Sequence, residues 1–216
     1  MPESHDDKTE MRLGSTWFTR TKEEESWNAI SHAAAAGLSL GYFFFLNHPA
    51  CKILGMGLFI GFLFSVMYHG AESSSREKKE FLRMLDMTAI HITICTTTVA
   101  HLLALGRDSI TLSLISMSLV SLAGVFFIVI RYGTARFDWY ALYTYLISAL
   151  VGCLIFYNNY DSQHLLGFTF LLGVIIYILG IAFYIRDSMA WYHTAWHVCV
   201  LIASSLHMYG IHRALN

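Results

Sequence analysis

Hydrophobic and polar positions divide this chain into seven long apolar segments separated by short polar gaps. The apolar segments cover approximately residues 29–46, 53–70, 84–105, 109–130, 139–157, 164–185 and 190–212. Each is about 18–23 residues long, close to the roughly 20 residues that an α-helix needs to cross the hydrocarbon core of a bilayer. Because the gaps are short, consecutive helices must be antiparallel neighbours. We therefore predict an all-α membrane protein, built as an up-and-down bundle of seven transmembrane helices.

The stretch before the first apolar segment is polar and charged. We divide the chain into a polar cytoplasmic N-terminal arm, residues 1–22, and a seven-helix transmembrane domain, residues 23–216. The arm lacks the apolar run of a cleavable signal peptide. We expect its first ten residues to be disordered and a short interfacial helix to begin around Ser15–Phe18.

The distribution of basic residues predicts the orientation of the bundle. Eleven of the 14 Lys and Arg residues flank the segment ends on the side of the N-terminus, and the three on the opposite side are Lys52, Arg107 and Arg213. Cytoplasmic loops carry the excess of Lys and Arg in membrane proteins. The N-terminus is therefore predicted to be cytoplasmic and the C-terminus to lie outside.

Composition agrees with a membrane protein. Hydrophobic residues make up 56% of the chain and charged residues 13%, whereas soluble domains have about 45–50% and about 25%. The formal net charge of −1 argues against a nucleic-acid partner, so membrane lipids are the expected partners. The four cysteines form no Cys-x-x-Cys pair, and three lie within apolar segments. We interpret them as small core residues rather than as disulfides or a thiolate zinc site.

Ionisable and hydroxyl side chains gather at one end of three segments. His193 and His197, four residues apart, begin the last segment, and Ser65 and His69 end the second with the same spacing. Residues four apart lie on one face of a helix. Asp86 begins the third segment. In the predicted topology all five residues lie just below the cytoplasmic surface.

The first helix adds a fourth set of polar residues at this depth. Glu25, Asn28 and His32 are spaced i, i+3 and i+7, which places them along one helical stripe. In contrast, segments 109–130, 139–157 and 164–185 have almost no ionisable residue within their spans. Ionisable groups at membrane depth are costly and usually functional. Their restriction to one layer, about 10 Å thick on helical geometry, predicts a shared site.

The residue types in this layer suit zinc. A catalytic zinc takes three protein ligands, here His69, His193 and His197, and leaves its fourth position to water. Zinc lowers the pKa of that water toward about 7 and so supplies a hydroxide nucleophile. Asp86 and Ser65 would then orient the water or polarise a substrate carbonyl.

Each motif taken alone also has a simpler interpretation. Asp86 could pair with Arg83, Ser65 could bond its own backbone, and Glu25 and Asn28 could form a solvated first turn. Their common depth favours the metal site. We interpret the other segment histidines as interhelical or interfacial hydrogen-bonding groups, and residues 76–80 as a solvated loop; these histidines are His91, His101, His207 and His212.

The four motifs together resemble the signature of the hemolysin III proteins, bacterial members of the progestin and adiponectin Q receptor family. In this sequence they read Glu25-x-x-Asn28-x-x-x-His32, Ser65-x-x-x-His69, Leu85-Asp86 and His193-x-x-x-His197. The resemblance implies a seven-helix protein of the bacterial inner (plasma) membrane with a zinc ion near the cytoplasmic face. The positions matching the three histidines would hold the ion, with those matching Ser65 and Asp86 beside it.

The wider superfamily includes alkaline ceramidases, so the resemblance points to hydrolysis of an amide or ester in a lipid. The chain departs from the family pattern in helix 3. Met87 stands where a His is expected, His91 where a Tyr is expected, and Val99-Ala100 where a Thr-Pro pair is expected. These departures leave the three expected zinc ligands intact.

Two functions follow from these observations. The first is a zinc-dependent intramembrane hydrolase, ceramidase-like, in which zinc-bound water attacks the carbonyl, Asp86 relays the proton and Ser65 donates to the oxyanion. The second is a non-enzymatic seven-helix protein, receptor-like or membrane-perturbing, in which a structural zinc ties the second helix to the seventh. A ligand set of three favours the first, and a closed set of four would favour the second.

Overall fold

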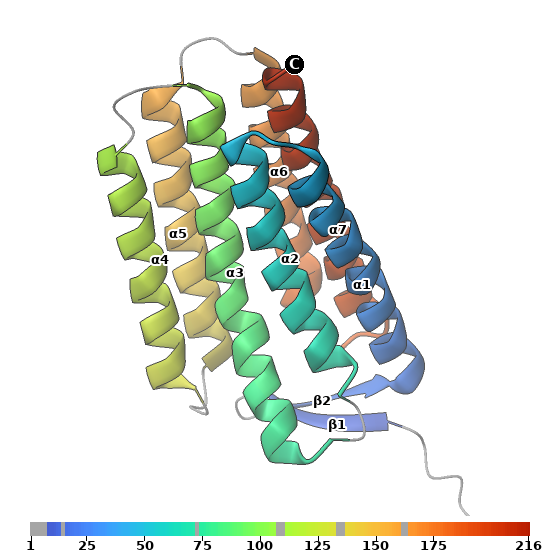
Figure 1. The fold of residues 1–216 in the computed structure, drawn as a ribbon. Coiled ribbons are helices and arrows are strands. Elements are labelled where there is room, and N and C mark those ends of the chain that lie inside the picture. Colours follow the sequence, from blue (N-terminus) through green and yellow to red (C-terminus); the bar gives the residue numbers. More distant parts are fainter. Residues whose placement is uncertain (1–7, 14–15, 72–73, 107–110, 133–136, 161–163) are drawn as a thin grey trace, which may run out of the picture.

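The fold is helical apart from one hairpin. The computed structural model describes residues 8–13, 16–71, 74–106, 111–132, 137–160 and 164–216 (Figure 1). Within this part of the chain, seven long helices follow an antiparallel pair of strands. The strands are β1 (Lys8–Leu13) and β2 (Thr16–Thr21), and the helices are α1 (Lys22–Phe45), α2 (Pro49–His69), α3 (Arg76–Ala104), α4 (Thr111–Arg131), α5 (Phe137–Asn159), α6 (His164–Tyr184) and α7 (Tyr192–Ala214).

Two helices begin well before their apolar segments because polar residues cap them. Thr21 and Glu24 form a reciprocal capping box that starts α1 at Lys22. The side chain of Ser75 accepts from the Lys78 amide and starts α3 at Arg76. Residues 76–80, which we expected to be a solvated loop, are therefore the first turns of a helix, and Lys79 is buried.

The N-terminal arm differs from expectation in its secondary structure. Thr16–Thr21 forms a strand that pairs with Lys8–Leu13 in antiparallel register, so the expected short helix is wrong. β-Branched and aromatic residues such as those in Thr16–Thr19 favour a strand once a partner strand is available. The expected disorder covers residues 1–7, which lie outside the described residues, and Lys8–Glu10, which belong to β1.

Helix packing places α7 at the centre of one side of the bundle. Consecutive helices α1 and α2, α2 and α3, and α6 and α7 pack along each other, and α7 also contacts α1, α2 and α3. Helices α4 and α5 pack against α3 on the opposite side (Figure 1). The hairpin lies at the end of the bundle where α1 begins and α2 ends (Figure 1). That end therefore gathers the termini of α1, α2, α3 and α7.

Six of the helices in the described chain are long and apolar enough to cross a membrane; these are α2 to α7. Large apolar side chains on their outer faces are exposed, including Leu112, Leu119 and Phe126 on α4. Such a continuous apolar exterior matches a hydrocarbon environment, and the protein is an integral, multi-pass membrane protein. Helix α1, with 24 residues, is longer than each of these helices except α3, but its polar stripe lowers its hydropathy.

Candidate metal centre

Three imidazoles converge where α2 ends and α7 begins. One nitrogen each from His69, His193 and His197 lies within 4.8 Å of the other two. His193 and His197 reach this point together because residues four apart share a helix face. The Nε2 atoms of His69 and His193 are 3.3 Å apart. The predicted triad is thus assembled in space.

One pair of the three rings has the separation expected of two ligands on a tetrahedral ion. Bonds of about 2.0–2.1 Å from zinc to imidazole nitrogens place two tetrahedral ligand atoms about 3.3 Å apart. The separation between His69 and His193 has this value. Nδ1 of His197 is buried and has no hydrogen-bond partner in the described chain. The three residues form a possible metal-binding site.

A carboxylate fixes the orientation of the first ring. Glu25 Oε2 lies 2.5 Å from Nδ1 of His69, and both side chains are at most 1% exposed. A proton on Nδ1 donated to Glu25 leaves Nε2 free to face His193. Carboxylates bound to the far nitrogen of a ligand histidine fix its tautomer and raise its basicity. The sequence-predicted stripe on α1 therefore acts on the triad through Glu25.

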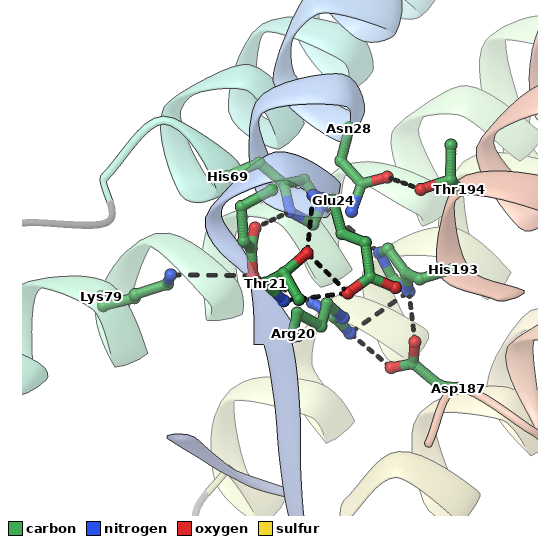
Figure 2. A network of polar contacts seen from close by, with 10 residues as sticks. Arg20, Thr21, Glu24, Asn28, His69, Lys79, Asp187, His193 and Thr194 are labelled. Carbon is green, nitrogen blue, oxygen red and sulfur yellow. Dashed lines mark hydrogen bonds and ion pairs between the residues drawn. The ribbon is translucent and has the colours of Figure 1, made fainter. Parts of the chain in front are cut away.

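A second carboxylate lies beside the second ring. Oδ1 of Asp187, in the turn between α6 and α7, is 3.0 Å from Nδ1 of His193, at ion-pair distance but without the alignment of a hydrogen bond. Arg20 forms an ion pair with Asp187 and lies 3.5 Å from Glu25. Figure 2 shows the Arg20 guanidinium next to the Asp187 carboxylate and the His193 ring. One cation thus holds both carboxylates in place.

The charges around Asp187 keep it ionised. Burial alone would raise the pKa of Asp187, but its contacts with the His193 ring and the Arg20 guanidinium outweigh burial and hold that pKa well below its ordinary value. The carboxylate is therefore charged at neutral pH. An ionised Asp187 can hold His193 electrostatically with Nε2 directed at His69.

The first turn of α1 also fixes the start of α7. Oε1 of Glu24, a residue labelled in Figure 2, accepts a hydrogen bond of 2.6 Å from the Trp191 amide. Trp191 has a φ of 64°, a left-handed conformation that is rare outside glycine. Surrounding contacts must stabilise such a backbone, and the bond from Glu24 is one of them. The position of His193 thus depends on α1.

Deeper along α1, the other two stripe residues contact α7. Oδ1 of Asn28 accepts a 2.7 Å hydrogen bond from the hydroxyl of Thr194. The ring of His32 stacks on that of His197, with centroids 3.7 Å apart and planes 12° apart. All three stripe residues are buried. The stripe is therefore one contact surface, which meets His69 at one end and His197 at the other.

Ser65 and Asp86 come together across α2 and α3. Ser65, one turn before His69, is buried, and its side chain lies within interaction range of the Asp86 carboxylate. Arg83, which spacing alone offered as a partner for Asp86, forms an ion pair with Asp138 of α5. The structure thus places both residues at the end of the bundle that carries the triad.

Sequence reasoning missed Arg20 and Asp187. We counted Arg20 only as a flanking positive charge, because it lies before the first predicted transmembrane segment; the structure places it in β2. Asp187 lies in a turn, where no helical period relates it to His193. The only available signal was an acidic residue close before the His193 motif, in a gap on the predicted cytoplasmic side.

Comparison with known proteins identifies the family of this chain. The family model for Haemolysin-III related proteins matches residues 20–208. The chain is 29% identical over 199 residues to a hemolysin-3 homolog of Bacillus subtilis, covering 86% of this chain and 91% of that protein. It is 28% identical over 207 residues to hemolysin-3 of Bacillus cereus, covering 88% and 91%. The chain therefore belongs to the haemolysin-III related family.

Proposed function

We propose that this protein is a zinc-dependent intramembrane hydrolase that cleaves an amide or ester bond in a lipid. The observation that carries the proposal is the set of three converging imidazoles, two of which have a carboxylate at the far nitrogen. Three histidines with such partners are typical of a catalytic zinc site. A purely structural zinc usually has four protein ligands, and the described chain places three at this point.

His69, His193 and His197 would hold the ion. When bound, zinc supplies a nucleophilic water at neutral pH and withdraws electron density from the substrate carbonyl. Asp86 accepts the proton that the water loses as its oxygen bonds to the carbonyl carbon. It then returns that proton to the nitrogen or oxygen that leaves as the carbon–heteroatom bond breaks. Ser65, beside Asp86, donates a hydrogen bond to the carbonyl oxygen as negative charge develops on it.

The proposal includes a topology of seven spans with a cytoplasmic N-terminus and an outer C-terminus, in the plasma membrane. Helix α1 packs between α2 and α7, and its 24 residues extend about 36 Å at 1.5 Å per residue, enough to span. The excess of Lys and Arg at the triad end supports a cytoplasmic location for that end. Reporter fusions after residues 22, 47 and 216 would test it, and an external N-terminus would exclude it.

A second function is a non-enzymatic membrane protein with a structural zinc. The observation that favours it is the position of the triad, which links the end of α2 to the start of α7. An ion there would cross-link two helices that contact each other only over part of their length. In that case chelation would unfold the protein, and no lipid would be cleaved.

The two functions are separated by one set of measurements on the purified full-length chain. We expect about one zinc per chain. We also expect release of fatty acid from ceramide or phospholipid, which mass spectrometry detects. Asp86→Ala should keep the zinc and lose turnover. Unchanged turnover in Asp86→Ala or His193→Ala would exclude the mechanism. Full zinc with no cleavage of either lipid, together with unfolding on chelation, would support the structural role.

A further inference from the structure

Helix α1 presents two buried side chains beside the metal centre whose nitrogen atoms lack partners. Asn28 is 0% exposed and His32 is 5% exposed. Among the described residues, Nδ2 of Asn28 and both ring nitrogens of His32 have no hydrogen-bond partner. The two residues are four apart on one face of α1. Buried polar groups in native proteins are almost always paired with protein or with a bound molecule, so water or a ligand is expected to supply the missing partners.

Contacts with α7 determine where these nitrogens lie. The Thr194 hydroxyl donates to Oδ1 of Asn28 at 2.7 Å, which leaves the Nδ2 amino group as the free part of the side chain. His32 stacks on His197 at 3.7 Å, and Phe62 approaches the His32 ring edge-on with centroids 5.0 Å apart. The free nitrogens of His32 therefore lie next to the ring of His197, which is a proposed metal ligand.

The chemistry of the two residues limits what they can bind. A neutral imidazole offers one donor and one acceptor, and the Asn28 amino group offers two donors. Neither side chain carries a fixed charge, and Arg20 and Lys79 at the neighbouring end of α1 lie against Glu25. The pair therefore suits an uncharged group that both donates and accepts, as a hydroxyl does, rather than a phosphate or carboxylate.

We infer that Asn28 and His32 form a hydroxyl-binding subsite that holds an alcohol group of the lipid substrate close to the bond that is cleaved. The inference rests on the proposed hydrolase, because it places the scissile carbonyl at the triad. It adds a requirement that the triad does not impose. The preferred substrate carries a hydroxyl a few bonds from the scissile amide or ester.

The test uses two uncleavable ligands, so that binding is measured without hydrolysis. Both are oleoyl ketones in which a CH₂ group replaces the amide nitrogen. One ends in a hydroxyl two carbons beyond this position, and the other ends in a methyl group. Titration calorimetry with the zinc-loaded full chain in detergent should show about tenfold tighter binding of the hydroxyl ketone, the effect of roughly one net hydrogen bond.

Two variants assign that preference to the subsite. His32→Phe keeps a ring stacked on His197 but removes both nitrogens, and Asn28→Ala removes the amino group; each should bring the affinity ratio toward one. His32→Gln retains hydrogen-bonding atoms and should restore part of the preference. Ser39→Ala, a buried position on the same helix whose hydroxyl bonds the Ala35 carbonyl, should keep the full ratio. Zinc content is measured in each variant.

The outcomes separate this inference from the proposed function. Equal affinity of the two ketones for the unmodified protein overturns the subsite, whether or not any variant folds. A preference that persists in His32→Phe and Asn28→Ala overturns it as well. A preference that depends on both residues, in a protein that cleaves no lipid amide or ester, supports the subsite and rejects the hydrolase.

Discussion

Within the part of the chain that the structure describes, imidazoles meet in two places in the bundle, and their surroundings differ. At the hairpin end, His69, His193 and His197 converge, with Glu25 and Asp187 beside two of them. Farther along α3 and α7, His101 and His207 meet edge to face with ring centroids 5.0 Å apart. Both of these rings are at most 1% exposed. In the triad, His69 and His197 are buried to a similar degree, whereas the His193 side chain is 12% exposed.

The difference lies in the partners. Nδ1 of His101 lies 2.8 Å from the Thr97 carbonyl, and the pair is surrounded by Phe156, Phe170 and Tyr177. Within the described residues, no carboxylate and no third imidazole join it. Both places contain buried nitrogens without partners, so free nitrogens alone do not distinguish them. A third ring and the anionic groups that orient the rings distinguish the triad.

The largest expected effect is on metal content. His193→Ala should reduce zinc from about one per chain to almost none, because a three-histidine site that loses one ligand no longer holds the ion firmly. His101→Gln should leave zinc at about one per chain, since that ring lies outside the triad. Elemental analysis of the purified variants measures both values. If the His193→Ala variant kept its zinc, or if the His101→Gln variant lost it, the triad would no longer differ from the His101–His207 pair in metal binding.

The next effect is on turnover. Asp86→Ala should reduce lipid hydrolysis by about 10²–10⁴-fold, the usual contribution of a positioned acid–base group, while zinc content stays unchanged. Single-turnover measurement of fatty-acid release gives the rate. Thr97→Ala is the control near the His101–His207 pair. It keeps the backbone carbonyl that contacts His101 and should retain the rate. If the Asp86→Ala variant hydrolysed lipid as fast as the unmodified chain, Asp86 would have no role in the mechanism.

Much of the fold was predictable because it follows from hydrophobic pattern and helical period. The apolar segments specified all seven helices, and spacings of four and seven placed His193 with His197 and Glu25 with His32 on shared faces. The prediction that His91 joins helices is also confirmed, since it lies 3.1 Å from Thr144 and 3.1 Å from Ser148 of α5.

Other features could not be read from the sequence because no period governs them. Asp187 reaches His193 from a turn, and Arg20 reaches Asp187 from a strand, so their proximity depends on how the chain enters α1 and α7. The hairpin itself depends on pairing between two short segments rather than on local propensity. The predicted third segment began at residue 84, whereas α3 begins at Arg76. The charged residues of a capped first turn have the same composition as a solvated loop.

A smaller effect on the triad should come from the carboxylate that supports His69. Glu25→Gln keeps the shape of the side chain but removes its charge, and should weaken zinc binding by roughly 10–100-fold, the usual cost of losing a partner of a ligand histidine. Glu23→Gln is the matched control, because Glu23 is exposed two residues earlier in the same turn. Competition with a chelator gives the affinities. Equal affinity in the two variants would show that Glu25 does not act on the metal centre.

The smallest effect concerns the stability of the protein near His101 and His207, and it leaves the triad unchanged. A Cβ at Gly173 of α6 would lie 2.5 Å from Nε2 of His207, whereas a Cβ at Gly37 of α1 would meet no atom within 4 Å. Gly173→Ala should therefore destabilise the protein by about 1–3 kcal/mol through overpacking. Gly37→Ala should be neutral or stabilising by up to about 1 kcal/mol, because Ala favours the helix. Thermal unfolding in detergent measures both, and zinc content should not change, since His207 is about three turns from His197. If Gly173→Ala released zinc from a folded protein, the two imidazole clusters would be coupled through α7, and the contrast between a metal centre and a packing contact would fail.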